Sequence, residues 1–183
     1  MSHPSGVRSP ARKRSPLAGL LIVVFILLCE LWVVVYMAPE ARLLRASKAV
    51  MRLVEKRAEE SPVALGLAAT RLGDWLAPEA ELAVDGEFQQ WMQGRRAIVQ
   101  LFTQIRAHTE ELVFLRPDIS LLADEKGRIT THMDATYRWI TGGLRIYGEG
   151  EARLHWNKGE KGWLIEQVEL HILQTDVFDW GSP

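Results

Sequence analysis

The sequence predicts an α+β fold behind a single membrane-spanning helix. Three observations support this expectation: a long apolar run near the N-terminus, helical spacing of hydrophobic residues through the middle of the chain, and alternating spacing from Leu112 onward. Three helices and a short strand followed by several long strands are typical of a sheet covered by helices. We expect a disordered basic tail over 1–16, the span over 17–38, a linker or helix extension over 39–46, the folded domain over 47–175 and a C-terminal tail over 176–183.

The apolar run from Leu17 to Ala38 has about the ~20 residues that an α-helix needs to cross a bilayer. Its Leu, Ile, Val and Phe residues favour insertion by about 4 to 8 kcal/mol, whereas Glu30 opposes insertion by about 2.5 to 3.5 kcal/mol. Neither a signal-peptidase site nor a lipoprotein cysteine fits, because Tyr36 and Leu28 stand where such sites have small residues. We therefore expect a retained anchor in the lipid bilayer.

Basic residues flank both ends of this span. Those before it lie in a short tail without acids, whereas those after it are diluted by Glu40 and Glu55. The positive-inside rule then places the N-terminus in the cytoplasm and the domain on the outer, periplasmic side of the inner membrane. Lipid cannot satisfy the carboxyl of Glu30, so we expect self-association or a partner transmembrane helix there.

Charge and composition exclude several classes of function. The net charge is −1 with acids and bases interspersed, so the chain lacks the basic surface that nucleic acid requires. The single cysteine, Cys29, lies in the predicted span, and no intrachain disulfide is possible. The histidines form no i, i+4 pair, and neither a phosphate-binding loop nor a nucleophile elbow is present. We expect no metal, no cofactor and no nucleic-acid partner.

Three helices are expected ahead of the long strands. Pro39 begins the first, and hydrophobic residues at helical spacing extend it to about Glu60. Ser61 caps the second, which Pro78 ends. A short extended piece over 81–84 precedes the third helix, whose hydrophobic residues follow the i, i+3, i+4, i+7 pattern: Ile98, Leu101, Phe102 and Ile105.

The period then changes from 3.6 to 2, which predicts strands at about 112–123, 128–140, 144–157 and 163–174. The two-residue loop Gly142-Gly143 suits a type I′ turn. Such a turn pairs Tyr137 with Gly148 on the neighbouring strand. The same register pairs Ala135 with Gly150. This register makes one face of the hairpin apolar or small and the other polar, and a slip of one residue would mix them.

The order of these elements and three short motifs resemble the nuclear transport factor 2-like superfamily, which includes SnoaL-like and ketosteroid isomerase-like proteins. The motifs are LAPEA at 76–80, GRRAI at 94–98 and GWLI at 162–165. The resemblance covers about residues 47–173 and implies a cystatin-like, cone-shaped antiparallel sheet wrapped on three helices. The open end of such a cone often holds a small molecule. Members include enzymes, binding domains and scaffolds, so the resemblance implies no single activity.

Two glycines fall on the apolar face of the predicted hairpin. Gly148 and Gly150 have no side chains there, which leaves either a pocket under Tyr137 and Trp139 or a place where the sheet bends. Both interpretations stay open, and a pocket alone would not imply catalysis.

The last strand has two possible orientations. If its odd positions point inward, Trp163 and Ile165 pack while Glu169 and His171 reach the cavity, where they could transfer protons. If its even positions point inward, apolar side chains fill the space instead. We take Tyr137, Trp139, Glu169 and His171 as candidate ligand-binding residues and assign no catalytic residue.

Two functions are compatible with these observations. The first is a non-catalytic, membrane-tethered module that binds a small apolar ligand or acts in assembly; the chain resembles the anchored scaffold subunits of type IV secretion machines in layout only. The second is an anchored isomerase, dehydratase or hydrolase of the SnoaL or ketosteroid isomerase kind. The isomerase apparatus includes a tyrosine on the first helix, and residues 43–76 contain none. This absence favours the first function.

The polar face of the sheet is a candidate dimer interface. It combines charges of both signs with an aromatic residue, and members of the resembled superfamily commonly dimerise through this face. The side chains are Arg138, Tyr147, Glu149, Glu151 and Arg153. Tethering in a membrane raises the local concentration, so a weak homodimer would be populated. A solvated face is the alternative.

Overall fold

The computed structural model describes residues 24–30, 32, 38–57, 59–86, 89–123, 128–160 and 162–179. The chain divides into two units, Met1–Ala38 and Pro39–Pro183. In the first unit residues 24–30 and 32 are helical, and no helix within the described ranges is long and apolar enough to cross a membrane. The predicted tail over 1–16 and most of the predicted span over 17–38 lie outside the described residues.

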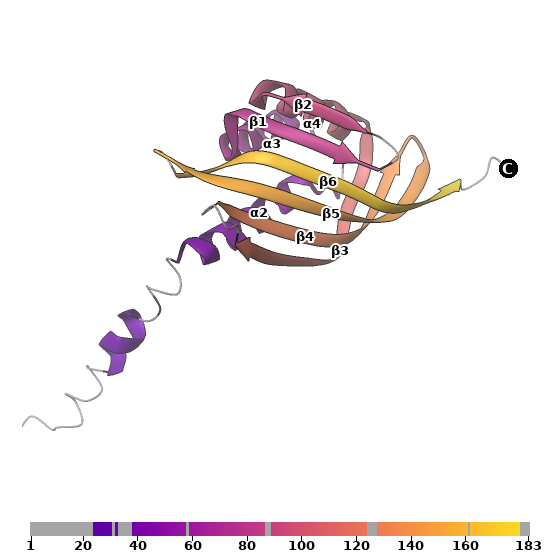
Figure 1. Ribbon diagram of the computed structural model, residues 1–183. Coiled ribbons are helices and arrows are strands. Elements are labelled where there is room, and N and C mark those ends of the chain that lie inside the picture. Colours follow the sequence, from indigo (N-terminus) through magenta and orange to yellow (C-terminus); the bar gives the residue numbers. More distant parts are fainter. Residues whose placement is uncertain are drawn as a thin grey trace, which may run out of the picture. The chain divides into compact units, whose positions relative to one another are not determined.

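Three helices of the second unit lie against one face of a curved sheet (Figure 1). They are α2 (Pro39–Val54), α3 (Pro62–Trp75) and α4 (Arg95–His108). The predicted cap of α3 is confirmed, because the Ser61 hydroxyl accepts a hydrogen bond from the backbone N–H of Ala64 at 3.2 Å. Residues 39–46 are the first turns of α2, and they bury Leu43 and Ala46 in the core.

Helix α2 ends earlier than the expected Glu60. The backbone N–H and C=O of Lys56 both bond to Leu112, at 2.8 and 2.7 Å, so the chain already runs alongside the sheet edge there. The carbonyls of Leu53 and Val54, left without helical partners at the end of α2, accept hydrogen bonds from the guanidinium of Arg106. Tertiary contacts therefore end this helix.

The sheet has six strands in the order β2-β1-β6-β5-β4-β3. The strands are β1 (Leu76–Asp85), β2 (Gln90–Gln93), β3 (Thr109–Ala123), β4 (Ile129–Thr141), β5 (Leu144–Gly159) and β6 (Gly162–Asp179). The predicted run of four long antiparallel strands is confirmed in β3 to β6. The expectation of an antiparallel sheet is wrong for one pair, because β1 pairs with β6 in parallel.

The short extended piece expected at 81–84 is the second half of the longer β1. Strand β2 was not predicted, because its four residues are too few to show a period of two. It pairs with β1 in antiparallel fashion and forms one edge of the sheet. These two strands extend the sheet beyond the predicted meander.

The predicted Gly-Gly hairpin is confirmed in full. Gly142 and Gly143 have φ angles of 56° and 79°, the left-handed conformation that both central residues of a type I′ turn require. Tyr137 lies directly opposite Gly148, and Ala135 opposite Gly150. The sheet therefore has an inner face, which packs on the helices, and an outer face, which carries the polar set.

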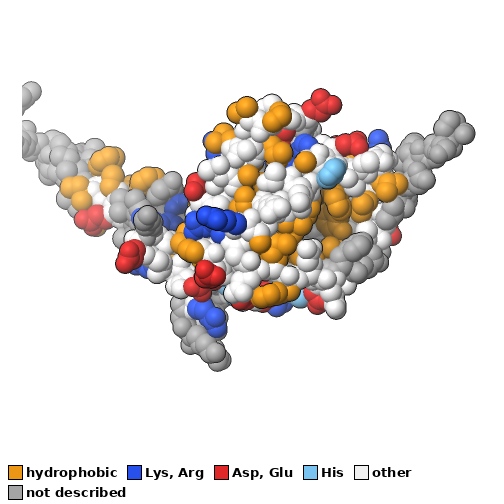
Figure 2. Space-filling model, turned by 90° about the horizontal axis from the view of Figure 1, so that it is seen from above, with side chains coloured by type: hydrophobic (Ala, Val, Ile, Leu, Met, Phe, Trp, Pro, Cys, Tyr) orange, Lys and Arg blue, Asp and Glu red, His pale blue; other side chains and the backbone are white. Residues whose placement is uncertain are grey.

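The core lies between the inner face and the helices. Its buried members include Leu43, Val50, Leu72, Leu76, Ile98, Met133, Leu154, Trp156 and Ile165. The face seen in Figure 2 has no large patch of charges of one sign. Acidic and basic side chains are scattered there singly or in small groups around hydrophobic ones. This agrees with the small net charge of −1.

Candidate functional site

Tyr137 lies on the inner face, where the glycines of β5 leave room. A Cβ atom at Gly150 would lie 3.7 Å from the Cε1 atom of Tyr137, so the tyrosine ring occupies the space that the missing side chain leaves. The hydroxyl of Tyr137 is 3.3 Å from Oγ1 of Thr175 on β6. The Tyr137 ring itself therefore occupies space that the pocket interpretation left open beside Gly150.

Trp139 also points into the fold and is tied to the end of α4. Its indole Nε1 donates a hydrogen bond to Oγ1 of Thr109 at 3.0 Å, and the Thr109 hydroxyl donates to the carbonyl of Ile105 at 2.8 Å. Thr109 is 3% exposed. The polar atoms of Tyr137 and Trp139 thus have partners within the domain: Tyr137 bonds within the sheet, to β6, and Trp139 connects β4 through Thr109 to the end of α4.

A buried polar chain missed by the sequence reasoning fills the middle of the cone. Trp156 donates from Nε1 to Thr131 Oγ1 at 2.9 Å, and this oxygen lies 2.8 Å from Ser47 Oγ on α2. The indole of Trp156 also packs edge-to-face on Trp75, with ring centroids 6.1 Å apart. Its only sequence signals were Thr131 on an otherwise apolar strand face and Ser47 one helical turn after Leu43.

Strand β6 changes its inward parity at a β-bulge. Trp156 pairs with Ile165 but His155 pairs with Gln167, so Glu166 is the extra residue. Before the bulge odd positions point inward, as Ile165 does at 1% exposure; after it even positions do, as Val168 and Leu170 pack on the core. A second bulge, at Leu173, returns odd positions such as Thr175 to the inner face, so each of the two orientations considered from the sequence holds for part of the strand.

The bulge at Glu166 places Glu169 and His171 on the outer face, so the first of the two orientations, in which they would reach the cavity beside Tyr137, does not hold for these residues. Glu169 lies opposite Arg153, with Oε2 at 3.9 Å from Arg153 Nη1, and its Oε1 is 3.3 Å from His155 Nε2. His171 Nδ1 is 3.5 Å from a carboxylate oxygen of Asp85. The four candidate ligand-binding residues therefore form two separate pairs on opposite faces of the sheet.

An open hollow of about 610 Å³ adjoins Glu169 and His171 on the outer face. The side chains along it come from β1, β2, β5 and β6, and include Asp85, Trp91 and Arg153. The indole of Trp91 is 64% exposed. This volume is within the range of small-molecule sites, roughly 300 to 1,000 Å³.

Histidine and carboxylate side chains continue across the outer face on β4 and β5. His132 Nε2 is 3.0 Å from Asp134 Oδ1, and one ligand atom each of His132, Asp134 and Glu151 lies within 4.8 Å of the others. These three residues could hold a metal ion, although Arg153, 4.0 Å from Glu151, would repel one. In the described part of the chain, His132 Nδ1 and Arg153 Nε are buried without a hydrogen-bond partner.

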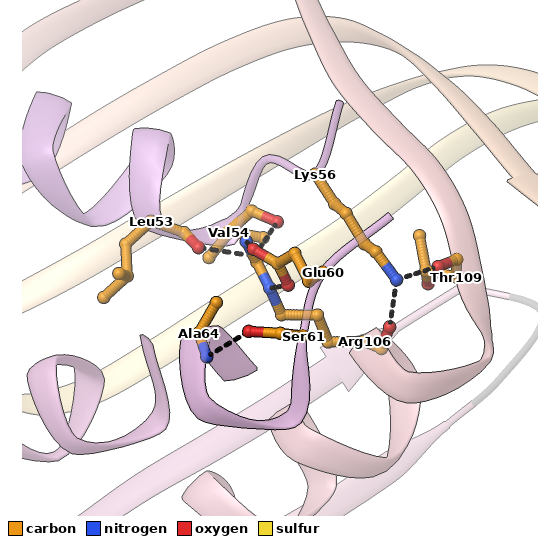
Figure 3. Close-up of polar contacts among 8 residues, drawn as sticks. All are labelled: Leu53, Val54, Lys56, Glu60, Ser61, Ala64, Arg106 and Thr109. Atoms are coloured by element: carbon orange, nitrogen blue, oxygen red, sulfur yellow. Dashed lines mark hydrogen bonds and ion pairs between the residues drawn. The ribbon is translucent and has the colours of Figure 1, made fainter. Parts of the chain in front are cut away.

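A second open hollow, of about 480 Å³, adjoins the segment that joins α2 to α3 and has mostly charged side chains along it. Arg106, 7% exposed, donates from Nε and Nη2 to the carboxylate of Glu60 at 2.7 and 2.6 Å (Figure 3). Its Nη1 donates to the carbonyls of Leu53 and Val54 at 2.6 and 3.0 Å. This hydrogen bonding lowers the pKa of Glu60, although burial acts in the opposite direction.

Lys56 extends the same network to the end of α4. Its Nζ donates to the carbonyls of Arg106 and Thr109, so one ammonium group satisfies carbonyls at the C-terminus of the helix (Figure 3). Together Arg106, Glu60 and Lys56 form what we call the charged clasp. Sequence reasoning missed it because charged residues in helices and loops usually face solvent.

Comparisons with known proteins support the fold assignment. No family model matches the chain, and no curated protein does. Among solved structures, a candidate scytalone dehydratase from Novosphingobium aromaticivorans superposes with a TM-score of 0.56 at 12% identity, over 80% of this chain and 93% of that one. ActVI-ORFA from Streptomyces coelicolor superposes with a TM-score of 0.52 at 11% identity, over 72% and 95%.

A candidate dehydratase of the NTF2-like family from Streptomyces avermitilis also superposes, with a TM-score of 0.52 at 13% identity, over 74% of this chain and 94% of that one. At such identities the similarity establishes the fold alone. The domain therefore has the nuclear transport factor 2-like fold that its motifs resemble.

Proposed function

We propose that the chain is a single-pass, membrane-anchored module that binds a ligand or acts in assembly without catalysing a reaction. One observation supports this proposal above the others: among the described residues, Arg106 is the one ionisable side chain that is buried. Its guanidinium is bound to Glu60 and to two carbonyls, and arginine stays protonated near neutral pH. In the part of the domain that the structure describes, the buried core thus contains no carboxylate, histidine or lysine that could transfer a proton.

The alternative is a membrane-tethered isomerase, dehydratase or hydrolase of the SnoaL or ketosteroid isomerase kind. Two of the structural neighbours carry dehydratase names, which favours this function. Glu169 and His171 could serve as proton-transfer groups only at the outer hollow, which is open to water. Acid–base catalysis benefits from a closed site that excludes water, so the open geometry favours binding.

Deuterium exchange separates the two functions. We expect the full chain in detergent, incubated in D₂O with small cyclic ketones and β-hydroxy ketones, to incorporate no deuterium and release no water above the buffer rate. Mass spectrometry would measure both. Exchange by the wild type that disappears in Glu169→Gln or His171→Asn, with circular dichroism unchanged, would establish the enzyme instead. The exposed Glu79→Gln is the matched control.

Tyr137 and Trp139 stay candidates for contact with a small apolar ligand at the inner face. Such a ligand would have to displace the Tyr137 ring from Gly150. Tyr137→Ala would then open a cavity, and small aromatic compounds should raise the melting temperature of this variant more than that of the wild type. Equal shifts for both proteins would argue against an inner-face site.

The anchor decides where the module acts. We place the N-terminus in the cytoplasm and the domain on the outer side of the inner membrane, because the short tail before the span is basic and free of acids. Protease added outside intact membranes should cut the domain and leave an N-terminal tag protected. The reverse protection pattern would invert this orientation.

Glu30 gives the anchor a means of association. A carboxyl in the hydrocarbon region is best satisfied by another helix, so we propose contact with a second copy or with a partner transmembrane helix. Crosslinking in native membranes should decrease in Glu30→Leu. Association that is unchanged by this substitution would remove the proposal.

Pairing through the outer face is a second route to assembly. Arg138 and Tyr147 lie opposite each other on β4 and β5, and Arg138 forms an ion pair with Glu111. We propose that two copies of the chain pair through this end of the outer face to form a homodimer. Analytical ultracentrifugation should detect a dimer that Tyr147→Ala weakens. A monomer at micromolar concentration, unaffected by the substitution, would favour a solvated face.

A further inference from the structure

The strand register aligns chemically related side chains across the outer face. One row runs from Arg153 on β5 to Glu169 on β6, then to Ala83 on β1 and Trp91 on β2. The neighbouring row contains Glu151, His171 and Asp85. Side chains within a row point to the same side because partners in register share a face of the sheet.

Ala83 leaves a gap between the two large side chains on either side of it in this row, Glu169 and Trp91. Its methyl group is the only side chain between Glu169 and Trp91, whose strands are two positions apart in the sheet and therefore separated by about 10 Å. The result is a slot with Ala83 as its floor, Glu169 on one side and the indole of Trp91 on the other. Asp85 and His171 close one end, and the slot belongs to the hollow of about 610 Å³.

The charge of the slot is predominantly negative. Along the hollow, the carboxylates of Glu169 and Asp85 outnumber the single guanidinium of Arg153. Glu151 in the neighbouring row adds a third carboxylate nearby. Glu169 also accepts a hydrogen bond from the side-chain amide of Gln167 at 3.0 Å. The terminal nitrogens of Arg153 already lie 4.0 Å from Glu151 and 3.9 Å from Glu169. The Asp85 side chain is 62% exposed and the indole of Trp91 is 64% exposed, so both are accessible.

We propose that this slot binds an organic cation, the ammonium or guanidinium end of an aliphatic chain. The cation would stack on the indole of Trp91, the aromatic side chain with the strongest cation–π attraction, and would face the carboxylates of Glu169 and Asp85. The aliphatic stem would lie on the methyl group of Ala83. The inference rests on the proposed function, because it names a ligand class for a site that binds without catalysis.

A pair of probes that differ only in charge tests the proposal. Butylguanidinium and butylurea have nearly the same shape, and only the first is a cation. Isothermal titration calorimetry on the full chain in detergent should detect butylguanidinium and no heat from butylurea. A short peptide with one arginine tests the source of the group: tighter binding than butylguanidinium identifies a protein side chain, and equal affinity identifies the free head group.

Three variants locate the binding. Ala83→Leu fills the floor without changing any charge and should abolish binding, whereas Trp91→Ala should weaken it at least threefold and Glu169→Gln more strongly. Glu79→Gln removes an equal charge from β1, outside the slot, and should leave the affinity unchanged. Trp91 is exposed on an edge strand, so Trp91→Ala should leave the domain folded. This variant therefore still tests the slot if Ala83→Leu destabilises the domain.

Several results would overturn the proposal. If butylurea binds as tightly as butylguanidinium, the contact depends on apolar surface and not on charge. If Glu79→Gln loses as much affinity as Glu169→Gln, the effect comes from the overall charge of the domain and not from the slot. Displacement of butylguanidinium by stoichiometric Zn²⁺, lost in His132→Ala, would assign these acids to a metal instead. Absence of heat at tens of millimolar would remove the slot but not the proposed function, which fails only if the deuterium exchange assay shows catalysis.

Discussion

The inner and outer faces of the same sheet use polar side chains in opposite ways. On the inner face Thr131, Tyr137 and Trp139 each have a hydrogen-bond partner within the domain. On the outer face arginines form ion pairs and histidines form close contacts with carboxylates, at 3.0 to 4.0 Å, and these groups stay partly exposed. The inner face therefore contributes stability, and the outer face holds the ionisable groups that a ligand or partner can reach.

Two tryptophans provide the largest test of this contrast. Trp156→Ala should lower the free energy of unfolding by about 3 to 5 kcal/mol, because the ring is 1% exposed and bonds to Thr131. Trp91→Ala removes the same side chain from the outer face and should change stability by no more than about 0.5 kcal/mol. Urea unfolding followed by circular dichroism would measure both. Similar losses in the two variants would contradict the assignment of the faces.

Two arginines extend the comparison to ion pairs. Arg106→Met should cost about 2 kcal/mol, because it leaves Glu60, whose side chain is 23% exposed, and two helix-end carbonyls without their donor. Arg138 on the outer face is hydrogen-bonded to Glu111, which raises the pKa of its guanidinium. Its side chain is 37% exposed, so Arg138→Met should cost only about 0 to 1 kcal/mol. Equal costs in urea unfolding would show that the charged clasp is as solvated as the surface pair.

Adjacent residues of β5 test the faces at a single point. Gly150→Leu should destabilise the domain by about 1 to 3 kcal/mol, because its Cβ alone would lie 3.3 Å from the carbonyl oxygen of His171 and 3.7 Å from the Tyr137 ring. Glu149→Leu places the same side chain on the exposed outer face and should change stability by about 0.5 kcal/mol or less. Thermal unfolding would rank the variants. A neutral Gly150→Leu would reveal an unfilled pocket beneath Tyr137.

The hairpin register was predictable because two independent patterns agree on it. The Gly142-Gly143 turn determines which residues face each other, and the separation of apolar from polar side chains allows no slip. The orientation of β6 was not predictable, because one parity fits Trp163 and Ile165 while the other fits Val168 and Leu170. Only the bulge at Glu166 reconciles them, and a bulge leaves no clear mark in a single sequence.

The candidate site was accessible to sequence reasoning only in part. Glu169 and His171, singled out together from the sequence, both adjoin the outer hollow, but the bulge places them on the face opposite Tyr137. The Trp91 slot depends on pairings of β1 with β6 and with β2. A parallel pairing between strands far apart in the chain has no local signature. The clasp of Arg106 and Glu60 likewise joins residues 46 positions apart.

The smallest expected effect is a pH dependence from Glu60 in the charged clasp. Its pKa is lowered in the folded chain, chiefly by the hydrogen bonding of Arg106. A carboxyl with a lowered folded-state pKa stabilises the fold above its unfolded pKa of about 4.3, and this contribution disappears as the pH falls through the folded-state value. Glu60→Gln should therefore be about 1 kcal/mol less stable than the wild type at pH 7, and the two should converge below about pH 4. Glu79→Gln, exposed and outside the clasp, should match the wild type at both pH values. Urea unfolding at pH 7 and pH 3 would show the convergence. A difference of the same size at both pH values would mean that the amide packs poorly, and that the carboxylate charge of Glu60 contributes nothing to the clasp.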